Sequence, residues 1–133
     1  MPYSTLSRCA FASLLLVVPA AHGDGDLVDA LALSQAWQDR VGETVTISGC
    51  MLTSATPDLV MCLATSERGR PPSIMVDPSG MEPQDLERAI RECSSYVGYP
   101  ICGVLLEGEI AADSGELKIM NSSVTWNYPS LDS

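Results

Sequence analysis

The chain has 133 residues, and 17 acidic against seven basic side chains give it a formal net charge of −10 at pH 7. This length suffices for one small domain and is too short for two. The acidic balance argues against a polyanionic ligand, because affinity for phosphate backbones depends on cationic side chains.

Residues 1–23 are predicted to be a secretory signal peptide. Arg8 is their only charged residue, and the apolar run "CAFASLLLVVPAA" follows it and ends in small residues. A run of this length is too short to span a bilayer, for which a helix needs roughly 20 residues. Cys9 lies at the start of this run and not after it, where it is badly placed for lipid attachment. We therefore expect an exported protein, periplasmic or secreted, whose folded part begins near Asp24.

The next segment, residues 24–41, is predicted to be helical. The sequence "DLVDALALSQAWQDR" places Leu27, Ala30, Leu31, Ser34 and Trp37 on one helical stripe. Residues 42–128 form the main domain, and residues 129–133 are expected to form a loose C-terminal tail.

Alternating apolar and polar residues predict five strands in the main domain. The first is "ETVTISGCML", in which Gly49 indicates a bulge or a sharp bend. The segments "LVMCLATS" and "SIMVD" are the second and third strands. Further on, "ICGVLLEGEIA" and "LKIMNSSVTWNY" form a hairpin, and a slip in phase near "NSS" indicates a second bulge.

A helix lies between the third and fourth strands, in "EPQDLERAIREC". Pro83 suits the first helical turn, and an apolar stripe ends at Cys93, which therefore points to the core. Arg88 and Glu92 are spaced to pair on the outer side of this helix.

The order of strand, strand, strand, helix, strand, strand is the plan of the OB-fold barrel. On the segments "VGETVTISGCM", "EPQDLERAIREC" and "GVLLEGEIAADSGELKI", the chain resembles the small exported bacterial OB-fold domains over about residues 41–127. The resemblance is topological and includes no signature motif. It implies a mainly β fold, a five-stranded OB-fold-like barrel with a helix between strands three and four and a short N-terminal helix. An SH3-like barrel or another five-stranded α+β arrangement is the alternative.

Four cysteines lie in the folded part: Cys50, Cys62, Cys93 and Cys102. An even number in a small exported domain indicates two disulfides, with three connectivities open. The turn "TSATPD" centres near residue 56, which places Cys50 opposite Cys62 and leaves Cys93 to pair with Cys102. Crossed connectivity is the alternative. Scattered spacing, and a single histidine at His22, argue against zinc and against a thiol catalyst with a histidine base.

The second and third strands contain no aromatic residue, although single-stranded nucleic acid is bound on basic grooves with aromatic stacking platforms. Arg68 and Arg70 are the one basic spot. This pair is a candidate holder of a carboxylate or phosphate, and the plainer interpretation is a solvated loop.

Acidic residues surround the predicted hairpin: Glu107, Glu109, Asp113 and Glu116. Such a group can supply oxygen ligands to calcium, and equally it is what a solvent-facing strand and turn contain. With Asp77, Arg68 and Arg70, Glu107 would fit a metal-dependent nuclease, although no spacing requires this. We favour the plain interpretation and expect no metal site and no cofactor.

Tyr96 and Tyr99 lie three residues apart in the crosslinked loop "ECSSYVGYPIC". Rigid exposed aromatics are good anchors for a partner, and the alternative is that one of them covers the end of the barrel. We therefore predict a non-catalytic binding module that contacts a protein or another envelope component, with Tyr96, Tyr99, Arg68 and Arg70 as candidate contacts. Oligonucleotide or oligosaccharide binding is the second hypothesis, and a metal-dependent hydrolase is the third.

Overall fold

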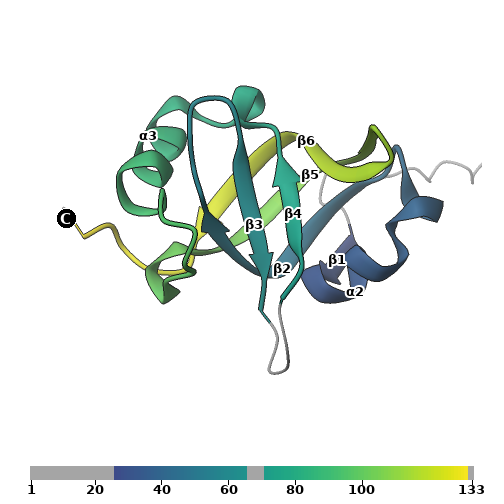
Figure 1. Cartoon of the computed structure of the whole chain (residues 1–133), viewed down its shortest axis with the longest axis horizontal. Helices are drawn as coiled ribbons and strands as arrows, with labels where there is room; N and C mark the ends of the chain where they lie inside the picture. The colour runs from purple at the N-terminus through teal and green to yellow at the C-terminus, as the bar shows by residue number, and fades with distance from the viewer. Residues whose placement is uncertain (1–25, 66–70, 132–133) are drawn as a thin grey trace, which may run out of the picture.

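The computed structural model describes residues 26–65 and 71–131 (Figure 1). The predicted signal peptide and the pair Arg68 and Arg70 lie outside these ranges. In the described part, six strands form one sheet, with two α-helices and three short 3-10 helices around it. The predicted mainly β class is confirmed, as is a helix between the third and fourth strands of the main domain.

The strands are β1 (Asp26–Asp29), β2 (Thr44–Thr53), β3 (Val60–Ala64), β4 (Ser73–Val76), β5 (Gly103–Asp113) and β6 (Glu116–Trp126). The α-helices are α2 (Ala30–Ala36) and α3 (Pro83–Glu92), and the 3-10 helices are η3 (Trp37–Arg40), η4 (Pro78–Gly80) and η5 (Pro100–Cys102). The strand order is β1-β2-β3-β4-β6-β5, and β5 also pairs with β2. Strands β2 to β6 therefore close into a ring of hydrogen-bonded neighbours. Figure 1 shows α3 and α2 on opposite sides of this ring.

Strand β2 takes part in both halves of the ring because it bends at Gly49. Its pairing with β5 shifts register between Ile47 and Cys50, and Gly49 has φ +73°. A Cβ atom at this position would lie 2.9 Å from Oδ1 of Asp29, so both the conformation and the space favour glycine. The predicted bend at Gly49 is confirmed.

The β5–β6 hairpin contains the second irregularity. Its register shifts between Glu107 and Glu109, and Asn121 on the facing strand has φ +53°. Gly108 lies at this shift, and a Cβ atom there would come within 2.3 Å of Cγ2 of Ile119. The bulge predicted near "NSS" is confirmed, and it brings the two strands close enough to exclude a side chain at position 108.

The core fills the ring and extends to both helices. Alternate residues of the strands supply most of it, as the period-two pattern predicts. Its largest fully buried side chains include Ile47, Leu52, Ile74, Leu106, Ile110 and Ile119. Ala89 and Cys93 join it from α3, and Leu33 and Trp37 join it from α2 and η3.

The N-terminal prediction was wrong in one respect. Residues 26–29 form a strand, β1, parallel to β2, and the helix starts only at Ala30, after Asp29 accepts a hydrogen bond from the Ala32 backbone N–H at 3.2 Å. Leu27 is 69% exposed, while Leu33 is buried. Because the capping carboxylate of Asp29 begins the helix late, the buried stripe is set by Ala30, Leu33 and Trp37.

Candidate partner-binding surface

Two disulfides are present, Cys50–Cys62 and Cys93–Cys102, with Cα–Cα distances of 5.4 and 6.0 Å. These are the pairs predicted from the sequence. The register predicted for the first pair was wrong: Cys50 does not lie directly opposite Cys62, but opposite Ala64, and Cys62 lies opposite Leu52. The hairpin turn is centred one residue later than expected, so the disulfide joins diagonal neighbours on the inner face of the sheet. Disulfides persist in oxidising compartments, which accords with an exported protein.

The second disulfide closes the loop of residues 94–101 between α3 and β5. Cys93 ends α3 and Cys102 ends η5, and both are buried. Two backbone hydrogen bonds tie the start of the loop to the β2–β3 turn: Ser54 N–H donates to the Ser95 carbonyl at 2.8 Å, and Ala55 N–H donates to the Cys93 carbonyl at 3.1 Å. The loop is therefore held at both ends.

The middle of this loop packs against strands β2 and β3. A Cβ atom at Gly98 would lie 2.9 Å from Cε of Met51 and 3.0 Å from Cδ2 of Leu63, so the loop backbone rests on the outer face of β2 and β3. Tyr96 is 85% exposed. Val97 and Tyr99 are also exposed. The loop therefore presents Tyr96, Val97 and Tyr99 to solvent from a fixed backbone.

A shallow hollow of about 440 Å³ continues this exposed area. It is lined by Pro100, Ile101, Tyr128, Pro129, Ser130 and Leu131. Tyr128 and Leu131 are exposed large apolar residues. We call the exposed loop residues and this hollow together the stapled-loop surface. Its members come from two segments that are far apart in the sequence, and only the loop was identified from the sequence.

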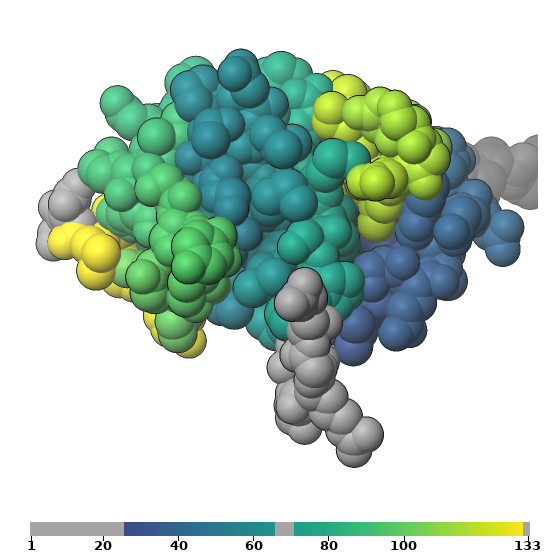
Figure 2. All heavy atoms as spheres, viewed as in Figure 1, coloured from purple at the N-terminus to yellow at the C-terminus, as the bar shows by residue number. Residues whose placement is uncertain are grey.

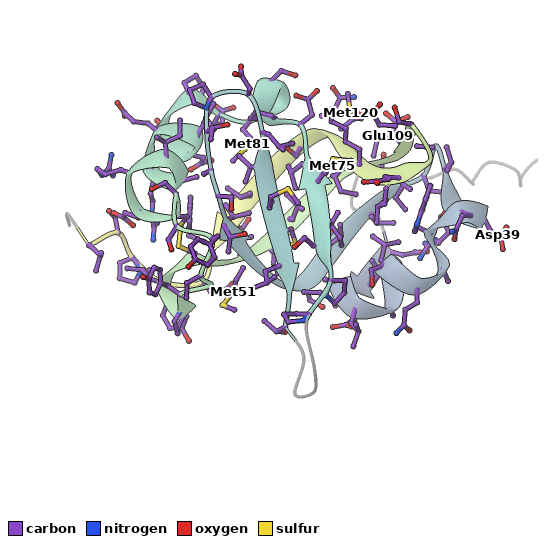
Figure 3. All side chains as sticks on the ribbon, in the orientation of Figure 1. Asp39, Met51, Met75, Met81, Glu109 and Met120 are labelled. Carbon is purple, nitrogen blue, oxygen red and sulfur yellow. A yellow bond between two sulfur atoms is a disulfide. The ribbon has the colours of Figure 1, made fainter. Side chains whose placement is uncertain are left out.

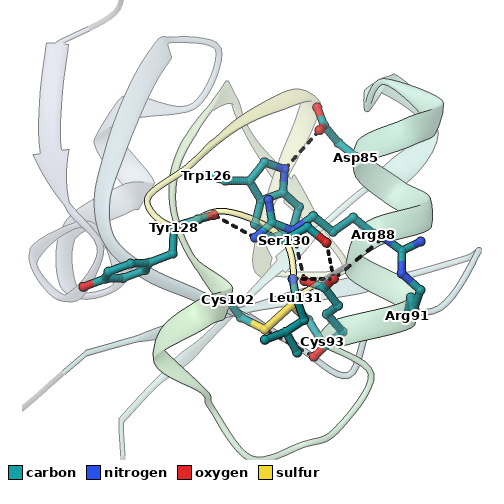
Figure 4. A network of polar contacts seen from close by, with 10 residues as sticks. Asp85, Arg88, Arg91, Cys93, Cys102, Trp126, Tyr128, Ser130 and Leu131 are labelled. Atoms are coloured by element: carbon teal, nitrogen blue, oxygen red, sulfur yellow. Dashed lines mark hydrogen bonds and ion pairs between the residues drawn. A yellow bond between two sulfur atoms is a disulfide. The ribbon is translucent and has the colours of Figure 1, made fainter. Parts of the chain in front are cut away.

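The C-terminal segment reaches this surface because it binds the end of α3 (Figure 4). Ser130 Oγ donates a hydrogen bond to Oε2 of Glu92, and the Leu131 backbone N–H donates to the same oxygen at 3.2 Å. The Arg88 guanidinium donates to the Tyr128 carbonyl at 2.8 Å. Residues 130 and 131, expected to belong to a loose tail, are therefore tied to the helix.

Arg88 and Glu92 form the centre of this network. Their ion pair measures 3.1 Å, and their side chains are 12% and 4% exposed. The Arg88 guanidinium also lies 3.8 Å from the centre of the Trp126 ring, whose Nε1 donates to Asp85 Oδ1 at 3.0 Å. The sequence placed this pair on the outer side of the helix. The structure corrects that placement, because the C-terminal segment and Trp126 cover the pair.

The contacts of Arg88 and Glu92 with residues 128–131, which we call the C-terminal clamp, are expected to weaken in acid. The hydrogen bond from Ser130 lowers the pKa of Glu92 below its usual 4.5, burial opposes this, and Arg88 and the Leu131 N–H lower it further. A carboxylate with a lowered folded-state pKa contributes stability above its unfolded pKa and loses that contribution as the pH falls through the folded value. We therefore expect the gap in unfolding free energy between the native chain and Glu92→Gln to be constant near neutral pH and to shrink below about pH 4.5. Urea titrations from pH 3 to 7 measure this gap, and a gap independent of pH would contradict the assignment.

The acidic residues near the hairpin do not converge. Oε1 of Glu107 accepts a hydrogen bond from Ser123 at 3.5 Å, Oε1 of Glu109 accepts one from Asn121 at 3.4 Å, and Asp113 forms an ion pair with Lys118 at 3.2 Å. Over residues 26–65 and 71–131, no three His, Cys, Asp or Glu side chains are grouped to hold a metal ion.

Asp77 has a local structural role. It caps η4 by accepting hydrogen bonds from the Ser79 backbone N–H and hydroxyl, each at 3.1 Å. Its backbone carbonyl accepts a hydrogen bond from the buried Ser122 hydroxyl at 3.1 Å. These bonds connect the end of β4 to the bulge of β6.

The outer face of β3 and β4 carries Met61, Leu63 and Met75, all partly buried and none aromatic. Figure 3 shows Met51 near the stapled loop and Met75 nearer the β5–β6 hairpin. The described residues of this face therefore offer no aromatic ring on which a base could stack.

Among the residues that the structure describes, no helix has the length and apolarity needed to cross a membrane. A scan against protein-family models finds no match to the chain, and a search of curated proteins likewise finds none.

Proposed function

We propose that this protein is an exported, non-catalytic binding module with an OB-fold barrel, and that it holds a protein partner on the stapled-loop surface. Three features support the barrel assignment: the ring of five strands, a first ring strand that bends to pair on both sides, and a helix between the third and fourth ring strands. An OB-fold is a support on which many ligand classes are bound, so the function follows from the surface and not from the fold.

The exposure of Tyr96 carries the proposal. A tyrosine that is 85% exposed, in a loop held by a disulfide and by backbone hydrogen bonds to the β2–β3 turn, loses little backbone entropy when it enters a pocket of a partner. Val97 and Tyr99 beside it in the loop, and Tyr128 and Leu131 at the neighbouring hollow, are exposed as well and add apolar area. Aromatic anchors amid apolar area are typical of protein interfaces.

The charge of the chain favours a basic rim on the partner. With 17 acidic and seven basic side chains, the chain attracts cationic surfaces and speeds their association at low salt. We therefore expect a partner with an apolar pocket bordered by lysine or arginine.

Site-specific photo-crosslinking identifies the partner. Benzoylphenylalanine in place of Tyr96 is expected to give one dominant protein adduct in the native envelope fraction, whereas the same group in place of Asp39, an exposed residue at the other end of the molecule (Figure 3), gives none. Equal adducts from both positions, or none from position 96, would overturn the proposal.

With that partner in hand, Tyr96→Ala combined with Tyr99→Ala is expected to weaken binding at least about tenfold. Tyr96 is 85% exposed and Tyr99 is 46% exposed, so the unfolding free energy is expected to fall by less than about 2 kcal/mol. Calorimetric titration and urea denaturation measure the two quantities. Asp39→Ala serves as the matched control and is expected to change neither.

A further inference from the structure

The ring of strands is held most weakly where β4 meets β6. These two strands are parallel and pair only through Met75 with Lys118 and Val76 with Ile119. Towards their first residues the two strands separate, and a hollow of about 410 Å³ lies between β4, the start of β6, and the α2–η3 segment. Figure 2 shows these three segments, in teal, yellow-green and blue, meeting on one face.

The lining of this hollow is largely apolar. Trp37, Ile74 and Leu117, otherwise buried in the core, reach it from three different elements. Met61 and Met75 border it from the outer face of β3 and β4. Methionine side chains are flexible and polarisable, so they adapt to side chains of different shape.

One edge of the hollow is formed by β4, whose first residue does not pair with β6. The Asp77 N–H donates to the Ile119 carbonyl at 2.9 Å, so the backbone of Asp77 faces β6. The direction of the backbone N–H and C=O groups alternates from one residue to the next along a strand. Ser73 lies four residues before Asp77, so its N–H and C=O point to the same side as those of Asp77, towards β6. The β4–β6 ladder ends at Met75, so β6 offers Ser73 no partner. An extended chain in the hollow could pair with β4 there at Ser73 alone, because Pro71 and Pro72 before it have no N–H.

The negative charge at the hollow favours a basic peptide segment over an acidic one. Among the residues that the structure describes, Glu116 is the only charged one that lines it, and it is exposed at the first residue of β6. Lys118, the nearest cation along β6, is engaged by Asp113 at 3.2 Å. A segment with a lysine or arginine beside its apolar side chains therefore meets a complementary charge, and an acidic segment is repelled.

We propose that the split between β4 and β6 binds an extended, basic and apolar segment of a partner protein, which adds to β4 as a strand. Its backbone pairs with Ser73, its apolar side chains enter the space bordered by Met61, Met75 and Leu117, and its cation lies beside Glu116. Strand addition of this kind draws affinity from the main chain and specificity from alternate side chains. The site shares no residue with the stapled-loop surface, so it does not depend on the function proposed above.

The test uses two acetylated octapeptides, one with the repeat Lys-Val-Thr-Val and one with Glu in place of Lys. Amide shifts of the 15N-labelled protein are followed up to 1 mM peptide. We expect the lysine peptide to shift the amides of Ser73, Met75 and Leu117, and the glutamate peptide to bind at least about tenfold more weakly. No shift with either peptide, or shifts confined to the stapled loop, would overturn the proposal.

Three variants identify the contacts. Glu116→Lys, at an exposed position, is expected to reverse the preference between the two peptides without affecting the fold. Ser73→Pro removes one backbone donor at the first residue of β4, where proline is tolerated, and is expected to weaken the lysine peptide at least about fivefold. Leu105→Glu, on the exposed side of β5, is the control and is expected to leave both affinities unchanged. An unchanged preference in Glu116→Lys would contradict the site.

A third titration distinguishes the class of ligand. Single-stranded octathymidylate is expected to cause no shift at Ser73, Met75 or Leu117, because Lys118 is the only cation within β4 and β6 and Asp113 engages it. Shifts of these amides by octathymidylate, without shifts by the lysine peptide, would show a nucleic acid site and overturn the peptide proposal.

Discussion

Replacing Cys50 and Cys62 together by alanine is expected to lower the free energy of unfolding by about 2 to 5 kcal/mol. The disulfide closes a loop with a sequence separation of 12, and both cysteines are at most 2% exposed. Its loss frees the unfolded chain, and it also removes two sulfur atoms from the core between β2 and β3. Urea denaturation under non-reducing conditions measures the change.

The second disulfide supplies the control for this experiment. Cys93→Ala with Cys102→Ala opens a shorter loop, with a sequence separation of nine, for which chain entropy alone predicts a loss of about 2 to 3 kcal/mol, and removing two buried sulfur atoms adds to it. Only this second variant is expected to free Tyr96 and to weaken partner binding. If the Cys50 and Cys62 variant unfolds at the same urea concentration as the native chain, the first disulfide contributes no stability and the prediction fails.

Replacing Arg88 by methionine is expected to cost about 2 to 4 kcal/mol. The substitution removes the 3.1 Å ion pair with Glu92, the hydrogen bond to the Tyr128 carbonyl and the contact with the Trp126 ring. Glu92 would then keep its charge at 4% exposure without its main cation. Breaking a buried pair costs more than the pair contributes, because the remaining charge is uncompensated.

This reasoning predicts a partial rescue. Glu92→Gln combined with Arg88→Met also removes the negative charge of Glu92, which Arg88→Met alone leaves without its cation. The double variant is therefore expected to be more stable than Arg88→Met alone. Limited proteolysis tests the C-terminal clamp directly. The C-terminal residues are expected to be cleaved faster in Arg88→Met than in the native chain. Glu87→Gln, at an exposed position of the same helix, is the control and is expected to change stability by less than about 0.5 kcal/mol. A double variant that is less stable than the single one would contradict the role assigned to Arg88.

Local patterns predicted the parts of this fold that local physics determines. The alternation from Val45 to Ile47 and the positive φ of Gly49 belong to one strand, so the sequence alone indicated both strand and bend. The apolar stripe of α3 ending at Cys93 likewise needs no distant partner. The four residues of β1 are too short for a clear period, and only their pairing with β2 makes them a strand.

The parts of the candidate sites that escaped prediction depend on contacts between distant segments. Arg88 and Glu92 have the spacing of a surface pair, and only the residues near Ser130 bury them. The half of the stapled-loop surface around Tyr128 arises from the same contact. The split at Ser73 follows from the point at which β4 and β6 diverge, and no composition or periodicity encodes it.

Gly98 separates the residues of the crosslinked loop into two classes. The backbone at position 98 lies against the flexible ends of the Met51 and Leu63 side chains, whereas the side chains of Tyr96, Val97 and Tyr99 are exposed. Selection can therefore exchange residues 96, 97 and 99 with less effect on the fold than a change at either of the two cysteines, which hold the ends of the loop. Such a loop can acquire a new partner by few mutations, and the same three positions are where a combinatorial library would be built to redirect this protein.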